Sequence, residues 1–351
     1  METMQACYYT KYGKPSVLTI GSLPRAQLLA PDDVLIQVYA ASINPMDYKR
    51  REGGFKAVLE TKWPQIVGYD LAGVVVLCGT DVKQLRVGDE VFACLPHDRT
   101  GSLAEYVSVS EYYVAHKPKN LTFVQAAALP ISSLVALQTL RRLELSEGKK
   151  LLLTGGSGGV GTLALQLAKN VFKAGTIATT ASLQKEHILT RLGAVDIIID
   201  YSEQSFDQTL REYDCAMDCT SEAKKCMDCV TQGGMVASIA DTPPPEALDD
   251  FPELGGRTSC CLGMFLGCLS YSVKSKARSK RLNYEYVFVA PNGEMLTEIA
   301  GFVDQGLLRP VIDKVYPFEL ALDAMELLEN GHLTGKIVVE FSVGVSQPEA
   351  E

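Results

Sequence analysis

The chain is poor in the residues that most often bind catalytic metal ions, and it has no apolar run long enough to cross a bilayer. Only four histidines and one tryptophan occur among its 351 residues. Its longest apolar stretch, Cys260 to Leu269, is too short and too rich in glycine for a transmembrane helix. The first residues lack the basic and apolar blocks of a signal peptide, so the sequence predicts a cytoplasmic protein.

Positive charge is also scarce. Lysine and arginine number 33 against 42 aspartates and glutamates, which gives a net charge of −9. This balance argues against a general nucleic-acid binder or a protein of anionic membranes. One local exception is the basic run from Lys274 to Arg281, for which a solvated face or loop is the alternative to a functional contact.

The ten cysteines are expected to be reduced thiols, because the chain shows no secretion signal. Four of them, Cys215, Cys219, Cys226 and Cys229, are spaced closely enough to suggest a zinc site. The first two lie in or directly after a strand-like segment, however, and the other two in a helix-like segment from Glu222 to Val230. We therefore expect buried thiols rather than a metal or redox centre.

A glycine-rich turn between a strand and a helix is the most informative feature of the chain. The strand from Leu151 leads directly into Gly156, Gly158 and Gly161, which fit the pattern G-x-G-x-x-G. Such glycines allow a tight turn and let the backbone approach a pyrophosphate, whose charge faces the start of the following helix. The residues between and after these glycines complete the predicted dinucleotide site: Ser157, Gly159 and Val160, followed by apolar residues at helical spacing, Leu163, Ala164, Leu167, Ala168 and Val171.

The segment after the second predicted strand indicates which dinucleotide binds. An NAD site usually has an acidic residue there, about 20 residues after the glycines. This chain has Thr180 and Ser182 in that place, and Lys185 follows. Hydroxyls and a cation suit a 2′-phosphate, so NADPH is favoured over NADH, although Lys185 also fits a solvated helix lysine.

The order of the predicted elements indicates an α/β protein with two domains. Strands and helices alternate from Gly148 to Ile239, which predicts a doubly wound parallel sheet. The first 120 residues instead contain strands separated by proline, glycine and aspartate, which is typical of an all-β domain. A further strand is predicted from Gly335 to Phe341, after a helix from about Leu320 to Glu329.

Several motifs resemble those of the medium-chain dehydrogenase/reductase superfamily. Besides the glycine turn they are the segments 41–47 (ASINPMD), 67–74 (VGYDLAGV), 87–92 (VGDEVF), 101–106 (GSLAEY) and 126–130 (AAALP). Within the superfamily the chain looks like the zinc-free quinone oxidoreductase branch. Its late segments, 284–312 and 330–336, are similar to the reticulon-4-interacting-protein-like members.

The resemblance implies a fold, a cofactor position and an assembly. It implies a GroES-like β-barrel domain of residues 1–122, completed by residues 311–351, and a Rossmann domain of residues 123–310. NADPH would lie between them, with Tyr201 near the adenosine and Lys336 at the cofactor. The resemblance also implies a homodimer.

Zinc-dependent relatives have a cysteine in the segment that here begins at Asn44, and a histidine where this chain has Tyr69. Neither ligand is present, and only Cys94 occurs where those relatives hold a structural zinc. Without a Lewis acid an alcohol substrate is disfavoured, whereas an enone or a quinone accepts hydride if hydrogen-bond donors meet the oxygen charge. Asn44 and Tyr69 are the candidate catalytic donors. Their alternative roles are a turn residue before a proline and an ordinary core aromatic.

Two departures from the family pattern leave other functions open. Many relatives have a tyrosine where this chain has Phe55, and a threonine near the nicotinamide where it has Val135. Ser132 and Ser133 are the candidate replacements for that threonine. The leading hypothesis is an NADPH-dependent quinone or enone reductase. The alternatives are an enoyl-thioester reductase and a non-catalytic NADPH-binding regulatory protein.

Overall fold

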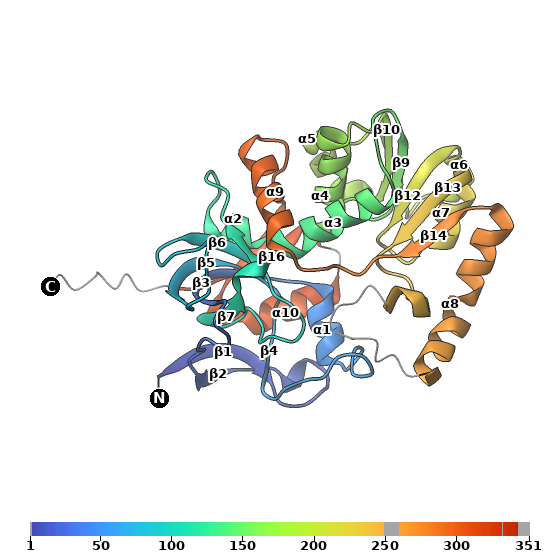
Figure 1. Cartoon of the computed structure of the whole chain (residues 1–351). Helices are drawn as coiled ribbons and strands as arrows, with labels where there is room; N and C mark the ends of the chain where they lie inside the picture. Colours follow the sequence, from blue (N-terminus) through green and yellow to red (C-terminus); the bar gives the residue numbers. More distant parts are fainter. Residues whose placement is uncertain (1, 249–259, 332, 343–351) are drawn as a thin grey trace.

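The computed structural model describes residues 2–248, 260–331 and 333–342. The strands of the N-terminal region lie at the lower left of Figure 1, and the parallel sheet with its helices lies at the upper right. The helix α3 (Pro130–Arg142) runs between the two regions.

The parallel sheet has six strands in the order β11-β10-β9-β12-β13-β14. Every neighbouring pair in it is parallel. The chain begins in the centre, moves outward to β11, then returns to β12 on the other side of β9. The strands are β9 (Lys150–Leu153), β10 (Thr176–Ala181), β11 (Ile197–Asp200), β12 (Tyr213–Asp218), β13 (Val230–Ser238) and β14 (Asn283–Tyr286). This is the Rossmann strand order, and its switch point lies between β9 and β12, where ligands bind outside the carboxyl ends of the strands.

Helices cover this sheet because its strands are apolar on both faces. Leu151, Leu152 and Leu153 of β9, for example, are all fully buried. The helices of this region are α4 (Gly159–Gln166, continued by the π-helical turn Leu167–Val171), α5 (Glu186–Leu192), α6 (Phe206–Thr209), α7 (Ala223–Cys229), α8 (Cys260–Lys280) and α9 (Gly293–Asp304).

The N-terminal region is built from antiparallel strands. One sheet has the order β2-β1-β4, and the other has the order β15-β16-β3-β5-β6-β8 with β7 paired to β3. The strands are β1 (Thr3–Tyr9), β2 (Thr19–Pro24), β3 (Asp33–Ile43), β4 (Gln65–Ile66), β5 (Asp70–Cys78), β6 (Glu90–Cys94), β7 (Tyr106–Ser110) and β8 (Val114–His116). Two helices accompany them, α1 (Pro45–Arg51) and α2 (Phe123–Ala127).

The C-terminal segment returns to this β-domain. β15 (Ile312–Pro317) pairs with β16 (Lys336–Glu340), and β16 pairs antiparallel with β3, so that Ile337 faces Ile43. Between them α10 (Ala321–Asn330) packs beside α1, where the buried Arg51 forms an ion pair with Glu329. The predicted fold class is confirmed, whereas the domain boundaries at 122/123 and 310/311 stay predictions.

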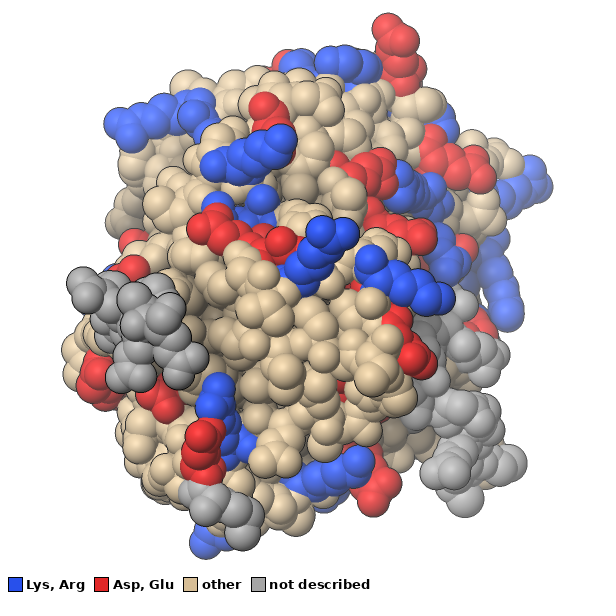
Figure 2. All heavy atoms as spheres, turned by 60° about the vertical axis from the view of Figure 1, so that its left-hand side comes forward, with Lys and Arg blue, Asp and Glu red and all other residues tan. Residues whose placement is uncertain are grey.

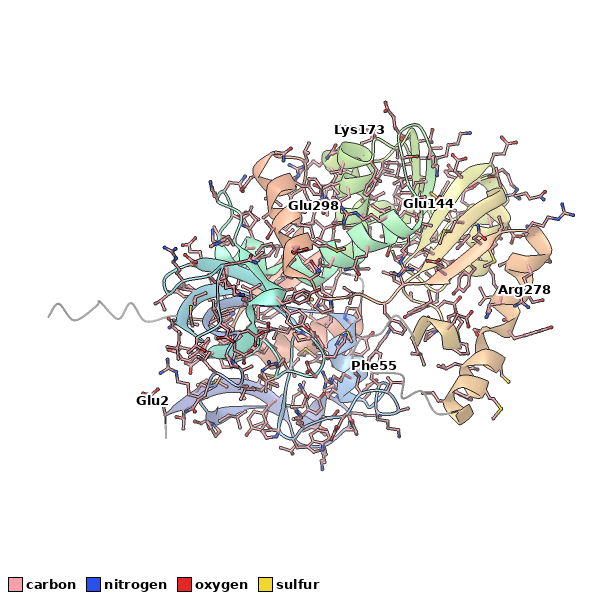
Figure 3. All side chains as sticks on the ribbon, viewed as in Figure 1. Glu2, Phe55, Glu144, Lys173, Arg278 and Glu298 are labelled. Atoms are coloured by element: carbon pink, nitrogen blue, oxygen red, sulfur yellow. The ribbon has the colours of Figure 1, made fainter. Side chains whose placement is uncertain are left out.

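The basic run lies in α8 up to Lys280, with Arg281 directly after the helix, and here the prediction of a solvated face or loop needs refinement. Lys276 and Lys280 form ion pairs with Asp228 of α7, and Lys274 forms one with Glu246. Three of the five basic side chains of the run therefore help to anchor the helix. Figure 3 labels Arg278 on the same helix.

Among the described residues, no helix is long and apolar enough to span a membrane. Acidic and basic side chains are interspersed on the face shown in Figure 2.

Candidate functional site

The glycine turn lies at the switch point of the parallel sheet, directly after β9. Gly155 has a φ of +71°, a conformation that favours glycine. A Cβ on Gly156 would come within 2.2 Å of the Thr179 hydroxyl, and one on Gly161 within 2.3 Å of the Gly155 carbonyl oxygen. The fold itself therefore requires glycine at these three positions.

Gly158 is different, because nothing in the protein requires a glycine there. Its φ of −78° is ordinary, and an added Cβ would meet only the Gly155 carbonyl oxygen, at 3.5 Å. Gly158 is also the N-cap of α4, so the amide groups of the first helical turn face this open space. The start of a helix beside a glycine with free space around it suits the binding of a pyrophosphate.

Lys336 brings a positive charge to the same turn. A Cβ on Gly159 would lie 2.8 Å from the Lys336 side chain and 3.3 Å from the Ser132 hydroxyl. Backbone contacts fix this approach, since the Gly335 amide donates to the Ser157 carbonyl oxygen at 2.9 Å. The structure thus brings the predicted cofactor residues Ser157, Gly159 and Lys336 together from opposite ends of the chain.

The Lys336 side chain is only 5% exposed, and Asp70 and Asn44 hold its ammonium. It donates to Asp70 Oδ2 at 3.2 Å and to Asn44 Oδ1. Asp70 is fully buried and also accepts hydrogen bonds from Ser42 Oγ at 2.9 Å and from the Ile131 amide at 2.7 Å. The carboxylate therefore fixes the lysine, β3 and the start of α3 in one arrangement.

Asn44 is the N-cap of α1, directly before Pro45 at the first helical position. Its amide Nδ2 donates to Asp70 Oδ2 at 2.9 Å, and its backbone amide donates to Asp47 Oδ2 at 2.7 Å. Asp47 also accepts from the Gly68 amide at 3.0 Å, and burial raises the pKa of this carboxyl to about 7. Asn44 thus has the predicted turn role, and in addition it contacts Lys336.

The structure places Tyr69 in the core of the β-domain. Its side chain is 4% exposed, and its hydroxyl accepts a hydrogen bond from Arg50 at 2.5 Å. Its ring lies edge-on to His97, with 5.0 Å between the ring centres. Burial, together with the nearby Arg50, lowers the pKa of His97 to about 3. This geometry fits the alternative role of Tyr69 as a core aromatic, and its role as a catalytic donor stays a prediction.

The residues predicted at the adenosine end lie at the ends of β10 and β11. The Thr180 hydroxyl accepts from the Gly155 amide at 2.9 Å, so it supports the glycine turn. Lys185 donates to the Leu333 carbonyl oxygen at 2.8 Å, and burial lowers its pKa. Ser182 is half-buried, and Tyr201 is 53% exposed directly after β11. Their contacts with a cofactor stay predictions.

The two departures from the family pattern lie in different surroundings. Val135 is a half-buried residue of α3 that packs on the main core. Ser133 bonds the Pro130 carbonyl oxygen within its helix, whereas Ser132 lies beside the glycine turn. Of the two serines, only Ser132 is therefore placed to contact a cofactor. Phe55 follows α1 and belongs to a separate apolar cluster.

Metal-ligating side chains do not gather in the part of the chain that the structure describes: no group of three or more His, Cys, Asp or Glu is positioned to hold an ion there. Cys215, Cys226 and Cys229 are buried, and burial raises the pKa of each thiol. Cys219 lies against the glycine turn, where a Cβ on Gly155 would be 3.7 Å from it.

The sequence analysis did not identify Arg50, Ser42 or Asp70 as residues of the site. No sequence signal marks Arg50 or Ser42, because each is recognisable only by its contact with Tyr69 or Asp70. The signal for Asp70 was present in the segment Gly68-Tyr69-Asp70, but its partner Lys336 lies 266 residues further along the chain.

Comparison with known proteins identifies both regions. Residues 30–119 match the alcohol dehydrogenase GroES-like domain family, and residues 192–339 match the zinc-binding dehydrogenase family. The solved quinone oxidoreductase of Coxiella burnetii superposes with a TM-score of 0.81 at 30% identity, covering 97% of this chain and 99% of that one.

Full-length relatives agree with this match. A 2-methylene-furan-3-one reductase of Solanum lycopersicum is 38% identical over 96% of this chain and 79% of its own. A chloroplastic NADPH-dependent alkenal/one oxidoreductase of Arabidopsis thaliana is 36% identical over the same shares. The human mitochondrial NAD(P)H oxidoreductase RTN4IP1 is 33% identical over 96% of this chain and 89% of its own, which confirms the predicted resemblance. The chain therefore belongs to the medium-chain dehydrogenase/reductase superfamily.

Proposed function

We propose that this protein is an NADPH-dependent reductase that transfers a hydride to a quinone or another conjugated carbonyl compound, without zinc. The observation that carries the proposal is the open space at Gly158, at the start of α4, with the Lys336 side chain against the next residue, Gly159. Relatives named as an alkenal/one oxidoreductase and a quinone oxidoreductase support the acceptor class. They do not favour an enoyl-thioester reductase or a regulatory protein.

Each part of the glycine turn has a task when the cofactor binds. Gly158 leaves room for the pyrophosphate, the first amides of α4 donate to it, and Lys336 balances its charge. Asp70 and Asn44 hold Lys336, so its ammonium is in place before binding. The bound nicotinamide supplies the hydride.

NADPH is proposed over NADH because Lys185, Ser182 and Thr180 stand where an NAD site has an acid. Lys185 lies in the segment after β10, and a hydrogen bond from its ammonium to the Leu333 carbonyl oxygen holds it there. An ammonium in this position attracts a 2′-phosphate, and no carboxylate is present at 180–185 to bind a free 2′-hydroxyl.

The absence of zinc is proposed from the donor set. By resemblance, Tyr69 replaces a zinc-binding histidine and Asn44 begins the segment in which zinc-dependent relatives have a cysteine. In this chain Asn44 bonds Lys336, and Tyr69 bonds Arg50. Two buried cations beside these side chains disfavour a divalent metal. Asn44 retains an amide that can donate to an acceptor oxygen, and protonation from water would complete the reaction.

We also propose an oligomeric state and a cellular compartment for this protein. A homodimer is proposed because β14 is the outer strand of the parallel sheet and pairs only with β13 among the described residues. Light scattering tests it. The cytosol is proposed for the compartment, although two relatives are named chloroplastic and mitochondrial, and microscopy of a tagged chain tests this.

The direct test of the function is turnover by the purified chain. NADPH consumption is measured with a panel of quinones, enones and enoyl thioesters, in parallel with the zinc content of the same sample. Rapid consumption with the first two classes and without stoichiometric zinc supports the proposal. Turnover only with enoyl thioesters, or only after zinc is added, contradicts it.

A further inference from the structure

The first half of α8 presents large apolar side chains to the surroundings of the protein. Met264, Phe265, Leu269 and Tyr271 are 62%, 60%, 50% and 67% exposed. We call these four residues the α8 patch. Apolar side chains that are exposed singly are normal on a protein surface, whereas a group on one element marks contact with another molecule or with a membrane.

The opposite face of α8 packs on the protein. Val273 and Ala277 are buried in the apolar cluster that α7 also joins. The exposed face follows helical spacing along the whole helix, from Met264 through Tyr271 to Arg278, which are seven residues or about two turns apart. Figure 1 shows α8 at the right-hand edge of the molecule, with the parallel sheet on its inner side.

The second half of α8 is basic, and the helix contains no acidic residue. Its three lysines form the ion pairs with Asp228 and Glu246 that are described above. Arg278 and Arg281 are exposed and form no ion pair with a residue that the structure describes. The exposed face of α8 therefore leads from the α8 patch to positive charge that no carboxylate balances.

The size and charge of this face distinguish between possible occupants. Four side chains at these exposures present on the order of 500 Å² of apolar surface, less than the roughly 800 Å² that each partner buries in a stable protein complex. A second copy joined through the same face would also bring two basic helices together. A bilayer requires no matching partner surface, because apolar side chains enter its headgroup region while basic side chains meet lipid phosphates.

We propose that the α8 patch, together with Arg278 and Arg281, docks the protein on the surface of a membrane that contains anionic lipid. Phe265 and Leu269 enter the headgroup region, Tyr271 lies at its boundary with water, and the arginines bind lipid phosphates. The net charge of −9 opposes approach from a distance, but salt screens that repulsion beyond about 8 Å, so docking depends on this local surface. The inference goes beyond the proposed function, because docking requires neither cofactor nor acceptor.

Co-sedimentation of the unmodified full chain with lipid vesicles tests the inference. Vesicles of phosphatidylcholine alone are compared with vesicles that also contain about 30% of the anionic lipid phosphatidylserine. We expect the anionic vesicles to bind at least about tenfold more protein at equal lipid, since each cation at such a surface contributes about fivefold. Binding should weaken as salt rises. Equal binding to both kinds of vesicle, or binding to neither, would overturn the proposal.

Serine substitutions test the apolar part of the surface. Phe265→Ser and Leu269→Ser should each lower binding to the anionic vesicles by about tenfold, because each removes a large apolar side chain from the inserted face. Leu29→Ser is the matched control, since Leu29 is 73% exposed but lies between β2 and β3 of the β-domain. It should bind as the unmodified protein does. If all three variants kept full binding, the α8 patch would not be the docking surface.

A charge reversal tests the basic part. Arg278→Glu should weaken binding to the anionic vesicles by at least about tenfold. Lys173→Glu makes the same charge change at an exposed position on another side of the molecule, as the labels in Figure 3 show, and should leave binding intact. Equal losses in the two variants would mean that only the total charge matters, which contradicts docking through α8.

A mass measurement distinguishes a membrane from a second copy of the chain. Light scattering compares the unmodified protein with Phe265→Ser in the absence of lipid. The proposal predicts the same mass for both, whatever the oligomeric state. A smaller mass for Phe265→Ser would show that the α8 patch joins copies of this chain, and it would overturn the proposal that a membrane covers it.

Discussion

The carboxyl edge of the parallel sheet is polar over β9 and β10 and apolar beyond β13 and β14. On the first side lie backbone amides, the Thr180 hydroxyl and the ammonium of Lys185, with Lys336 above the turn. On the second side lies a small apolar cluster, with Leu59 and Leu248 at its buried centre and Phe288 packed against them. The two ends of one sheet edge thus differ in polarity, and the polar end is the one at which we propose that the pyrophosphate of the cofactor binds.

The largest expected effect comes from placing a negative charge on the polar side. Gly158→Asp keeps a good N-cap for α4 and meets no protein atom closer than 3.5 Å at its Cβ, so the fold should be retained. Its carboxylate faces the pyrophosphate, and a like charge at about 4 Å costs ~4 kcal/mol at an effective dielectric constant of about 20. Titration should show NADPH affinity lowered by about 10³-fold.

Gly158→Asn is the matched control for size. It should lower affinity much less, because it adds nearly the same volume without the charge. If the two variants bound NADPH as tightly as the unmodified protein, the glycine turn would not be the pyrophosphate site.

A double-mutant cycle at Lys336 and Asp70 tests the polar side of the sheet edge further. Lys336→Met leaves the buried Asp70 without its cation, which should cost about 3–5 kcal/mol of unfolding free energy and lower NADPH affinity by roughly tenfold to a hundredfold. Adding Asp70→Asn should restore part of the stability but none of the affinity. Urea denaturation and NADPH titration measure the two effects. Recovery of both together would show that Lys336 acts only through stability.

The smallest expected effect concerns the choice between NADPH and NADH. The unmodified protein should prefer NADPH, and Lys185→Glu should remove about tenfold or more of that preference, since it replaces the proposed 2′-phosphate partner by a repelling group. Lys173→Glu makes the same charge change at an exposed position and should leave the preference intact. Equal affinities of the unmodified protein for both cofactors would refute the role of Lys185.

The two sides of the sheet edge also differ in how well the sequence predicted them. The polar side was predictable, because the glycine turn and the absence of an acid after β10 are local patterns set by backbone geometry. The fold followed from the alternation of strands and helices. The strand order of the parallel sheet and the return of β16 to β3 agree with it.

The apolar side of the sheet edge and the contacts that hold Lys336 could not be predicted from local sequence patterns. Phe55, Leu248 and Phe288 are ordinary apolar residues until tertiary contacts bring them together. Asp70 and Lys336 form a pair only because β16 closes the β-domain. The hydrogen bond from Arg50 to the Tyr69 hydroxyl likewise has no signal in the sequence, because it depends on how α1 packs beside Tyr69.

The central claim is that a hydride is delivered from NADPH to the far carbon of a conjugated carbonyl. The most direct measurement follows the label from NADPH deuterated at the transferred position during reduction of pentyl vinyl ketone, with product analysis by mass spectrometry and NMR. The account predicts ethyl pentyl ketone with deuterium on the carbon β to the carbonyl. An allylic alcohol with deuterium on the carbinol carbon, or no transfer to any conjugated acceptor, would contradict it.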